Sequence, residues 1–212
     1  MKVVTIGLDL AKNIFQVHGV DREGHPLLRK RLRLRRVQVA GFFANLPPCT
    51  VGMEACCGAH HWSRVIGQFG HTVRLIAPQF VKPYVKSNKN DANDAEAICE
   101  AVSRPQMRFV PAKSVEQQNI QSLHRVRSRL VSSRTQLGNQ IRGLLSEYGI
   151  VLPEHVSQLR RGLPLIIEDA ANELTAFSRR LFASLYDELL SLEEKIEAID
   201  EQIRAVYQGN EA

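Results

Sequence analysis

Three short strand-like segments near the start of the chain constrain its fold more than any other feature. Residues 3–9, 14–20 and 27–34 are rich in strand-forming side chains, and only a few residues separate each segment from the next. Parallel neighbours need a crossover of roughly a dozen or more residues, which these short connections do not supply. The sequence therefore predicts a three-stranded antiparallel meander.

Helices and strands alternate after the meander. The pattern predicts helices at 37–46 and 60–69, strands at 50–54 and 72–77, and helical pieces through Val102. The resulting order, βββαβαβα, is typical of the α/β mixed sheet of the ribonuclease H-like (RuvC-like) fold, flanked by helices. In that sheet three antiparallel strands are continued by two parallel ones, and the first and fourth strands are neighbours.

A helical extension is expected to follow the α/β part. Residues 114–148 contain no proline, and leucines recur there every seven residues, which is typical of a long amphipathic helix. A looser stretch with Gly162 and Pro164 is expected next. We therefore divide the chain into an α/β catalytic domain at residues 1–112 and a helical coiled-coil extension at residues 113–212.

The end of the extension carries a strict heptad repeat. Apolar residues alternate at spacings of four and three along a helix that extends to about Tyr207. They are Leu185, Leu189, Leu192, Ile196, Ile199, Ile203 and Val206. The flanks of this helix are acidic, whereas those of the preceding helix are basic. The two helices pair either as an antiparallel hairpin or, through the second helix, with another chain to form a dimer or higher homo-oligomer.

Four acidic residues fall where the predicted fold brings chain segments together. Asp9 lies near the end of the first strand and Glu54 ends the fourth, so the two are expected about 5 Å apart across neighbouring strands. Asp91 and Asp94 begin a helical segment and share one helix face. Like charges this close do not all stay ionised without a cation. Mg²⁺ and Mn²⁺ prefer such oxygen ligands.

A purely structural interpretation of these acids is also open. Asp9 then ends a strand, Asp91 caps a helix, and Asp94 is a solvated first-turn acid stabilised by the helix dipole. An acid inside an otherwise apolar strand is costly to bury without a partner, and this cost favours the metal site.

Basic residues outnumber acidic ones and concentrate in the first 180 residues. The chain has 28 Lys and Arg against 22 Asp and Glu, a net charge of +6, which fits a polyanionic partner such as DNA or RNA. On the third strand, alternate positions share one face. These positions are Arg29, Arg31, Arg33 and Arg35. They either protect an edge strand from aggregation or contact phosphate, and both roles can hold.

Two further groups of basic residues are candidate nucleic-acid contacts. Few acids balance the basic face of the helix at 114–148, so nucleic-acid binding is preferred there over a solvated surface. Its residues are Arg125, Arg127, Arg129 and Arg134. Lys12 and Lys89 are close in sequence to the acids and either contact phosphate or are plain surface lysines.

The cysteines and the apolar runs exclude other classes of protein. Cys49, Cys56, Cys57 and Cys99 form no C-x-x-C pair, so reduced thiols of a cytoplasmic protein are expected. His60 and His61 favour core packing over zinc binding, because adjacent residues rarely ligate one tetrahedral ion. The longest uncharged run is interrupted by prolines, so no membrane span is expected.

Three motifs together resemble a known family. Residues 7–12, 52–55 and 89–98 resemble the DEDD insertion-sequence transposases, a family related to the Piv invertase that includes bridge-RNA-guided recombinases. The resemblance implies that Asp9, Glu54, Asp91 and Asp94 bind two Mg²⁺ ions in a RuvC-like domain. It also implies that the coiled-coil segment contributes to oligomerisation and to binding a guide RNA.

Family members continue into a C-terminal transposase domain with a serine that attacks DNA. This sequence stops at Ala212, so an N-terminal portion without that domain is expected. The resemblance thus favours the catalytic region of a DNA transposase or recombinase that cleaves and exchanges DNA strands. A stand-alone Holliday-junction resolvase-like endonuclease and a non-catalytic dimeric nucleic-acid-binding fragment are the alternatives.

Overall fold

The computed structural model describes residues 2–10, 14–33, 36–85 and 91–210. The chain forms two compact units, Met1–Ser114 and Val115–Ala212, which are called here the α/β unit and the helical unit. Each unit has its own hydrophobic core.

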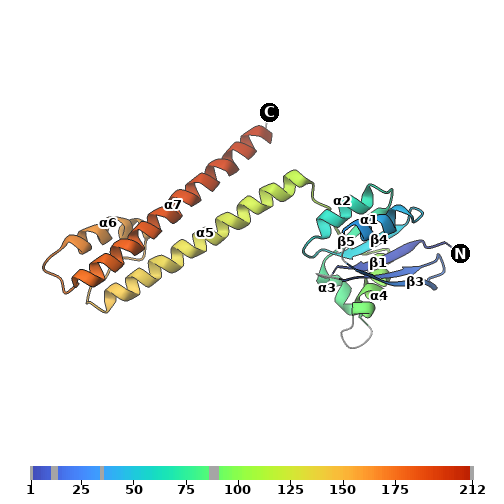
Figure 1. Cartoon of the computed structure of the whole chain (residues 1–212), viewed down its shortest axis with the longest axis horizontal. Coiled ribbons are helices and arrows are strands. Elements are labelled where there is room, and N and C mark those ends of the chain that lie inside the picture. Colours follow the sequence, from blue (N-terminus) through green and yellow to red (C-terminus); the bar gives the residue numbers. More distant parts are fainter. Residues whose placement is uncertain (1, 11–13, 34–35, 86–90, 211–212) are drawn as a thin grey trace. The chain divides into compact units, whose positions relative to one another are not determined.

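One mixed sheet of six strands forms the centre of the α/β unit (Figure 1). The strands are β1 (Thr5–Asp9), β2 (Ile14–Val20), β3 (Pro26–Arg33), β4 (Thr50–Glu54), β5 (Thr72–Ile76) and β6 (Phe109–Val110). Their order across the sheet is β3-β2-β1-β4-β5-β6. β1, β2 and β3 form an antiparallel meander, and β1, β4 and β5 are parallel neighbours. This topology confirms the predicted ribonuclease H-like fold, to which β6 is an unpredicted addition.

Helices cover both faces of the sheet. Figure 1 shows α1 (Arg36–Ala44) and α2 (Ala59–Gly67) on one face of the sheet and α3 (Pro78–Val81) and α4 (Asp91–Val102) on the other. The 3₁₀ helix η1 (Lys82–Tyr84) follows α3 directly. The observed helices match the predicted ones within a few residues at each end, as expected for helix boundaries.

Side-chain alternation in the central strands separates the two faces. Ile6 and Leu8 of β1 are fully buried in the core beneath α1 and α2. The residue between them, Gly7, faces α4, since a Cβ at this position would lie 2.0 Å from the carbonyl oxygen of Ala95. A Cβ at Gly52 of β4 would lie 2.8 Å from the Cβ of Val102. Glycine at these two positions therefore lets α4 lie directly on the sheet.

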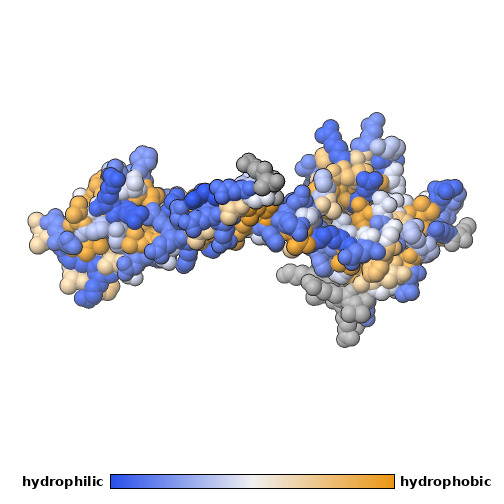
Figure 2. Space-filling model, turned by 90° about the horizontal axis from the view of Figure 1, so that it is seen from above, coloured by the Kyte–Doolittle hydropathy of each residue, from blue (hydrophilic) through white to orange (hydrophobic). Residues whose placement is uncertain are grey.

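The helical unit consists of three helices, α5 (Val115–Ser146), α6 (Val156–Glu168) and α7 (Ala176–Asn210). α5 and α7 pack together as an antiparallel pair. Arg127 of α5 forms an ion pair with Asp200 near the C-terminal end of α7. The ring centroid of Tyr148, just after α5, lies 6.2 Å from that of Phe182 near the N-terminal end of α7. The antiparallel hairpin is therefore the pairing that the heptad residues make within this chain. Figure 2 shows hydrophilic residues over much of the visible face of this unit.

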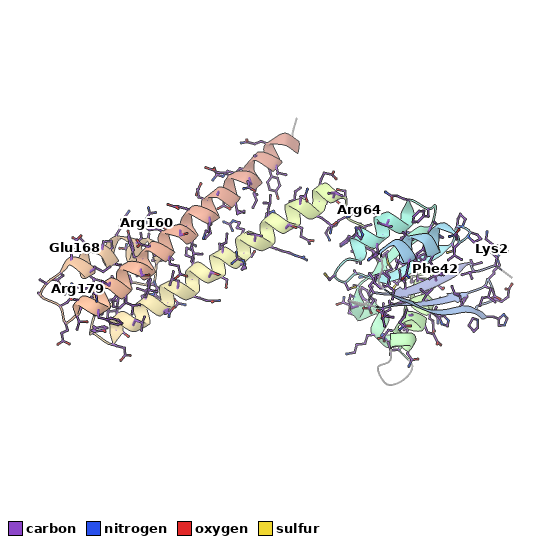
Figure 3. The ribbon with its side chains drawn as sticks, in the orientation of Figure 1. Lys2, Phe42, Arg64, Arg160, Glu168 and Arg179 are labelled. Atoms are coloured by element: carbon purple, nitrogen blue, oxygen red, sulfur yellow. The ribbon has the colours of Figure 1, made fainter. Side chains whose placement is uncertain are left out.

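The looser stretch predicted around Gly162 and Pro164 is wrong, because α6 continues through both residues. Proline lacks the N–H that would reach the carbonyl of Arg160 in a regular helix. The Tyr186 hydroxyl donates to that carbonyl at 3.2 Å, and this bond from α7 replaces the missing one. The guanidinium of Arg179, labelled in Figure 3, donates to carbonyls at the end of α6. Tertiary contacts therefore stabilise a helix that local sequence signals disfavour.

No helix in the described part of the chain is both long enough and apolar enough to cross a membrane.

Candidate metal centre

Two of the predicted acids end adjacent parallel strands. Asp9 is the last residue of β1 and Glu54 the last of β4, and the register of the two strands pairs Leu8 with Met53 just before them. Because alternate residues of a strand face the same way, Asp9 shares the face of Gly7 and Glu54 that of Gly52. Both acids therefore belong to the sheet face on which α4 lies.

α4 adds a third acid to this face. Asp94 lies in its first turn, directly before Ala95, the residue whose carbonyl meets β1 at Gly7. Burial raises the pKa of the Glu54 carboxyl above its usual range, and repulsion from the Asp94 carboxylate raises it further. This repulsion requires the two carboxylates, 40 positions apart in the sequence, to be near neighbours in the fold.

Asp91 begins α4, one helical turn before Asp94. Positions three apart share a helix face, so the backbone puts Asp91 on the side of α4 that carries Asp94. The structure describes the backbone at Asp91 and not its side chain. Lys12, Arg35 and Lys89, three of the predicted phosphate contacts, lie outside the described residues.

Cys56, for which the sequence predicts only a reduced thiol, lies beside the acids. Burial raises the pKa of its thiol, and the charges of Glu54 and Asp9 raise it further. A thiol in this environment stays protonated and is a poor nucleophile, since the thiolate is the reactive form. Its sequence position two residues after Glu54 was the available signal, because a chain leaving a strand end stays near that end.

The donor set suits a divalent cation. Acids of β1, β4 and α4 belong to one face of the sheet, and burial and the Asp94 carboxylate raise the pKa of the Glu54 carboxyl. A cation among them stabilises their ionised forms, and hard divalent ions prefer carboxylate oxygens over other ligands. The residues present therefore fit a divalent cation such as Mg²⁺ or Mn²⁺.

A second group of possible ligands lies in the turn between β2 and β3. Ligand atoms of Asp21, Glu23 and His25 lie within 4.8 Å of one another. Although burial opposes ionisation of Asp21, hydrogen bonds from the His25 and Glu23 N–H groups lower the pKa of its carboxyl. Glu23 and His25 are exposed. These contacts account for Asp21 as a turn-forming residue.

Three histidines and cysteines elsewhere in the α/β unit, His60, His71 and Cys49, have structural partners. The Nδ1 atom of His60 accepts the Lys113 N–H at 3.1 Å, and Arg64, labelled in Figure 3, donates to the Lys113 carbonyl at 2.6 Å. His71 accepts the Cys49 N–H at 3.2 Å. Burial raises the pKa of the Cys49 thiol to about 11. These contacts agree with the packing roles that the sequence favours for His60 and its neighbours.

The predicted basic strand lies at an edge of the sheet, as β3. Its backbone register pairs Arg29 with His18, Arg31 with Gln16 and Arg33 with Ile14. Gln16 is in turn the partner of Asp9. Position 31 is thus two strands from Asp9 along one cross-strand row.

Some of the predicted basic residues of α5 are exposed, and others are paired or half-buried. Arg125 and Arg129 are exposed. Arg127 makes a two-bond contact with Asp200 of α7, and this hydrogen bonding lowers the pKa of the Asp200 carboxyl. Arg134 is half-buried. The exposed pair is therefore available to an external phosphate, while Arg127 also stabilises the hairpin.

Comparison with known proteins identifies relatives along almost the whole chain. A "Probable family 20 transposase" of Pseudomonas aeruginosa is 53% identical over 99% of this chain and 62% of its own length. The "Transposase for insertion sequence element IS1111A" of Coxiella burnetii is 47% identical over 97% of this chain and 56% of its own length. A transposase for insertion sequence element IS1328 of Yersinia enterocolitica is 46% identical over 95% and 59%, respectively. The chain therefore spans little more than half the length of these relatives.

The family model of the IS110 DEDD transposases, described as "Transposase", matches residues 6–150. This range contains Asp9, Glu54, Asp91 and Asp94. The match covers more than half of the chain, and the relatives share the same description. The chain belongs to the IS110 family of DEDD transposases.

Proposed function

We propose that this chain is the metal-dependent catalytic region of a DNA transposase that takes part in cleaving and exchanging DNA strands. The observation that carries the proposal is geometric: Asp9 and Glu54 end adjacent parallel strands on the sheet face against which α4, with Asp94 in its first turn, lies. Burial and the Asp94 carboxylate raise the pKa of the Glu54 carboxyl, which agrees with this arrangement. Glu54 of β4 and Asp94 of α4 lie close enough to repel each other. A purely structural role for either residue would not require the two carboxylates to be close together.

Asp9, Glu54, Asp91 and Asp94 are the proposed ligands of two Mg²⁺ or Mn²⁺ ions. Such ions polarise a scissile phosphate and neutralise the charge that develops on it during phosphoryl transfer. Asp9 is our candidate for a ligand shared by both ions, because β1 pairs with β4 and packs against α4. Glu54 and Asp94 then complete one ion each, and Asp91 supplies a further oxygen or orients water.

DNA and a guide RNA are the proposed partners of the basic residues. We assign phosphate contacts to the edge strand and to α5, since phosphate neutralisation by Arg and Lys dominates nucleic-acid affinity. The residues are Lys12, Arg29, Arg31, Arg33, Arg35, Lys89, Arg125, Arg127, Arg129 and Arg134. We further propose that the helical unit, which begins after the α/β catalytic unit, mediates association into dimers or larger oligomers.

Metal binding is tested by thermal unfolding with and without Mg²⁺ or Mn²⁺. An ion that binds only the folded state stabilises it by mass action, by about 2.7 kcal/mol at ~100 times its Kd. The native chain is expected to melt at a temperature several degrees higher with metal than in EDTA. A Glu54→Ala/Asp91→Ala variant is expected to lose most of this rise.

The matched control is Glu188→Ala/Glu201→Ala, which removes two exposed carboxylates from α7. It is expected to keep the native response to metal. An equal rise in the native chain and in the Glu54→Ala/Asp91→Ala variant would contradict the metal site.

Cleavage assays separate the transposase from a stand-alone resolvase. The chain is incubated with Mn²⁺ and labelled branched or linear DNA, beside an Asp9→Ala variant. Cutting of branched DNA that disappears in Asp9→Ala would favour the resolvase. If the chain binds metal and nucleic acid but does not cut DNA, the result favours the catalytic region of a transposase whose other part is needed for cleavage.

A further inference from the structure

An aromatic and cationic surface lies at the β5–β6 edge of the α/β unit. It comprises Arg74, Phe80, Tyr84, Arg104, Arg108 and Phe109, and is called here the aromatic–arginine surface. The guanidinium carbon of Arg74 lies 5.1 Å from the ring centroid of Phe109, and that of Arg104 lies 5.5 Å from the ring centroid of Tyr84. Arginines thus alternate with aromatic rings on this surface.

A hollow of about 290 Å³ opens within the surface. Its lining includes two aromatic side chains, Phe80 and Tyr84, and two arginines, Arg104 and Arg108. Among the described residues that line the hollow, none is acidic. Its volume is close to the lower bound of ~300 Å³ for pockets that hold small molecules, so it suits one flat ring system better than a large ligand.

The charge of the surface favours an anion. Arg104 is already paired with Glu100, which leaves the charge of this arginine partly balanced within the chain. Arg74 and Arg108 are exposed and add positive charge beside Phe109 and Tyr84. A ligand with both a planar aromatic group and a phosphate matches this combination, because bases stack on aromatic rings while arginine binds phosphate.

The sheet register relates this surface to the acids. Ile76 of β5 is the register partner of Glu54 in β4 and of Phe109 in β6. Residues paired in this way lie on the same face of a sheet, so Phe109 and Glu54 share the face covered by α4. Two strand spacings of ~4.8 Å separate these backbone positions, a distance of about 10 Å.

We infer that the aromatic–arginine surface binds unpaired bases of a single DNA strand, whose backbone continues to the acidic site. Tyr84 and Phe80 stack against a base in the hollow, and Arg108 and Arg74 contact the adjoining phosphates. The continuation to the acids rests on the proposed function, whereas the stacking contacts require no metal. We assign DNA as the ligand because the surface lies on the same sheet face as the acids that are proposed to act on DNA.

Binding of fluorescein-labelled single-stranded DNA, measured by anisotropy in EDTA, tests this surface independently of the metal. Tyr84→Leu removes the ring while keeping an apolar side chain in the core that surrounds it. Base stacking on one aromatic ring is worth enough to change affinity roughly tenfold, so Tyr84→Leu is expected to raise Kd about tenfold. Tyr84→Phe keeps the ring and is expected to bind like the native chain.

Tyr207→Leu is the matched control, since Tyr207 is an exposed tyrosine of the helical unit. It is expected to leave Kd unchanged. Arg108→Ala is expected to weaken binding and to lower the slope of log Kd against log salt concentration by about one, as for the loss of a phosphate contact. An abasic DNA strand is expected to bind the native chain and Tyr84→Leu equally.

A Tyr84→Leu variant that keeps the native circular dichroism and binds DNA as tightly as the native chain overturns the inference. Single-stranded RNA bound more tightly than DNA, with the same loss in Tyr84→Leu, overturns the assignment to DNA. The metal proposal fails separately, through the melting response of Glu54→Ala/Asp91→Ala. The effect of Tyr84→Leu on DNA affinity therefore tests the aromatic–arginine surface, and the melting response to metal tests the acidic site, each without the other.

Discussion

At the scale of the residue, the α/β unit depends on two kinds of position. Gly7 and Gly52 have no side chain because α4 occupies the space that a Cβ would need. Glu54 is an acid that the fold partly buries and that Asp94 repels. The glycines let α4 lie directly on the sheet, and Asp94 in the first turn of α4 adds to the effect of burial on the pKa of Glu54.

Gly7→Ala is expected to destabilise the α/β unit. The added Cβ would lie 2.0 Å from the Ala95 carbonyl oxygen and 2.5 Å from the Cys99 nitrogen, so the α4 backbone must shift. Overpacking of this kind costs about 1–3 kcal/mol, occasionally more. Urea unfolding measures the loss, and the melting response to Mn²⁺ is expected to shrink with it.

Gly41→Ala is the control for that substitution. No atom lies within 4 Å of a Cβ built at Gly41 in α1, and the change is expected to raise stability by about 0.5 kcal/mol. Gly7→Ala with native stability would contradict the close packing of α4 against β1.

The stability of the metal-free chain is expected to depend on pH through Glu54. Its folded pKa is raised above the usual value of 4.5 by burial and by Asp94. Its contribution to stability is therefore present below that value and is lost as pH rises through the raised pKa. In EDTA, Glu54→Gln is expected to gain stability relative to the native chain as pH increases through this window.

Melting temperatures of both proteins between about pH 4 and 8 measure this difference. Glu188→Gln, at an exposed position of α7, is expected to show none of it. A constant offset between Glu54→Gln and the native chain at every pH would mean that Glu54 is not destabilised when ionised.

At the scale of the element, α7 packs through an apolar stripe, and polar contacts at its edges add to this packing. Leu189 of α7 is fully buried in the core of the helical unit, and the Ile196 side chain is 6% exposed. α6, between the two long helices, is held by Tyr186 and Arg179 of α7. The helical unit is therefore a packed three-helix assembly within one chain.

Leu189→Ala is expected to cost about 2–5 kcal/mol, the range for a buried leucine. Hydrogen exchange is expected to accelerate in α5 and α7, since Leu189 belongs to their shared core. Leu181→Ala removes a leucine of the same helix that is 42% exposed, and a loss below about 0.5 kcal/mol is expected there. Equal losses in the two variants would contradict the assigned packing face of α7.

At the scale of the whole molecule, the chain divides into two compact units with separate cores. All four proposed ligands belong to the α/β unit, as does the contact of Arg64 and His60 with Lys113. The proposed guide-RNA contacts on α5 belong to the helical unit. Metal binding and RNA binding are therefore expected to be separable by dividing the chain.

A fragment of residues 1–114 is expected to fold and to keep the Mn²⁺-dependent rise in melting temperature. The reason is that its core and its acids make their contacts within the α/β unit. Calorimetric titration is expected to give a Kd for Mn²⁺ within about threefold of that of the full chain. A folded fragment without metal binding would show that the helical unit completes the site.

The sequence by itself determined the strand order, the strand ends that carry Asp9 and Glu54, and the heptad stripe of α7. These features depend on local periodicity and on short connections, which are properties of neighbouring residues. The positions of Asp91 and Asp94 on one helix face followed from helical spacing in the same way.

Only the tertiary structure decided the features that depend on contacts through space. The repulsion between Glu54 and Asp94, the proximity of Cys56 to both strand-end acids and the pairing of Phe109 with Ile76 join segments distant in sequence. α6 passes through Pro164 because Tyr186 supplies a hydrogen bond that the local sequence lacks. The heptad stripe fitted a hairpin and a dimer equally well, and packing against α5 selected the hairpin within this chain, since a stripe specifies a buried face and not the partner that buries it.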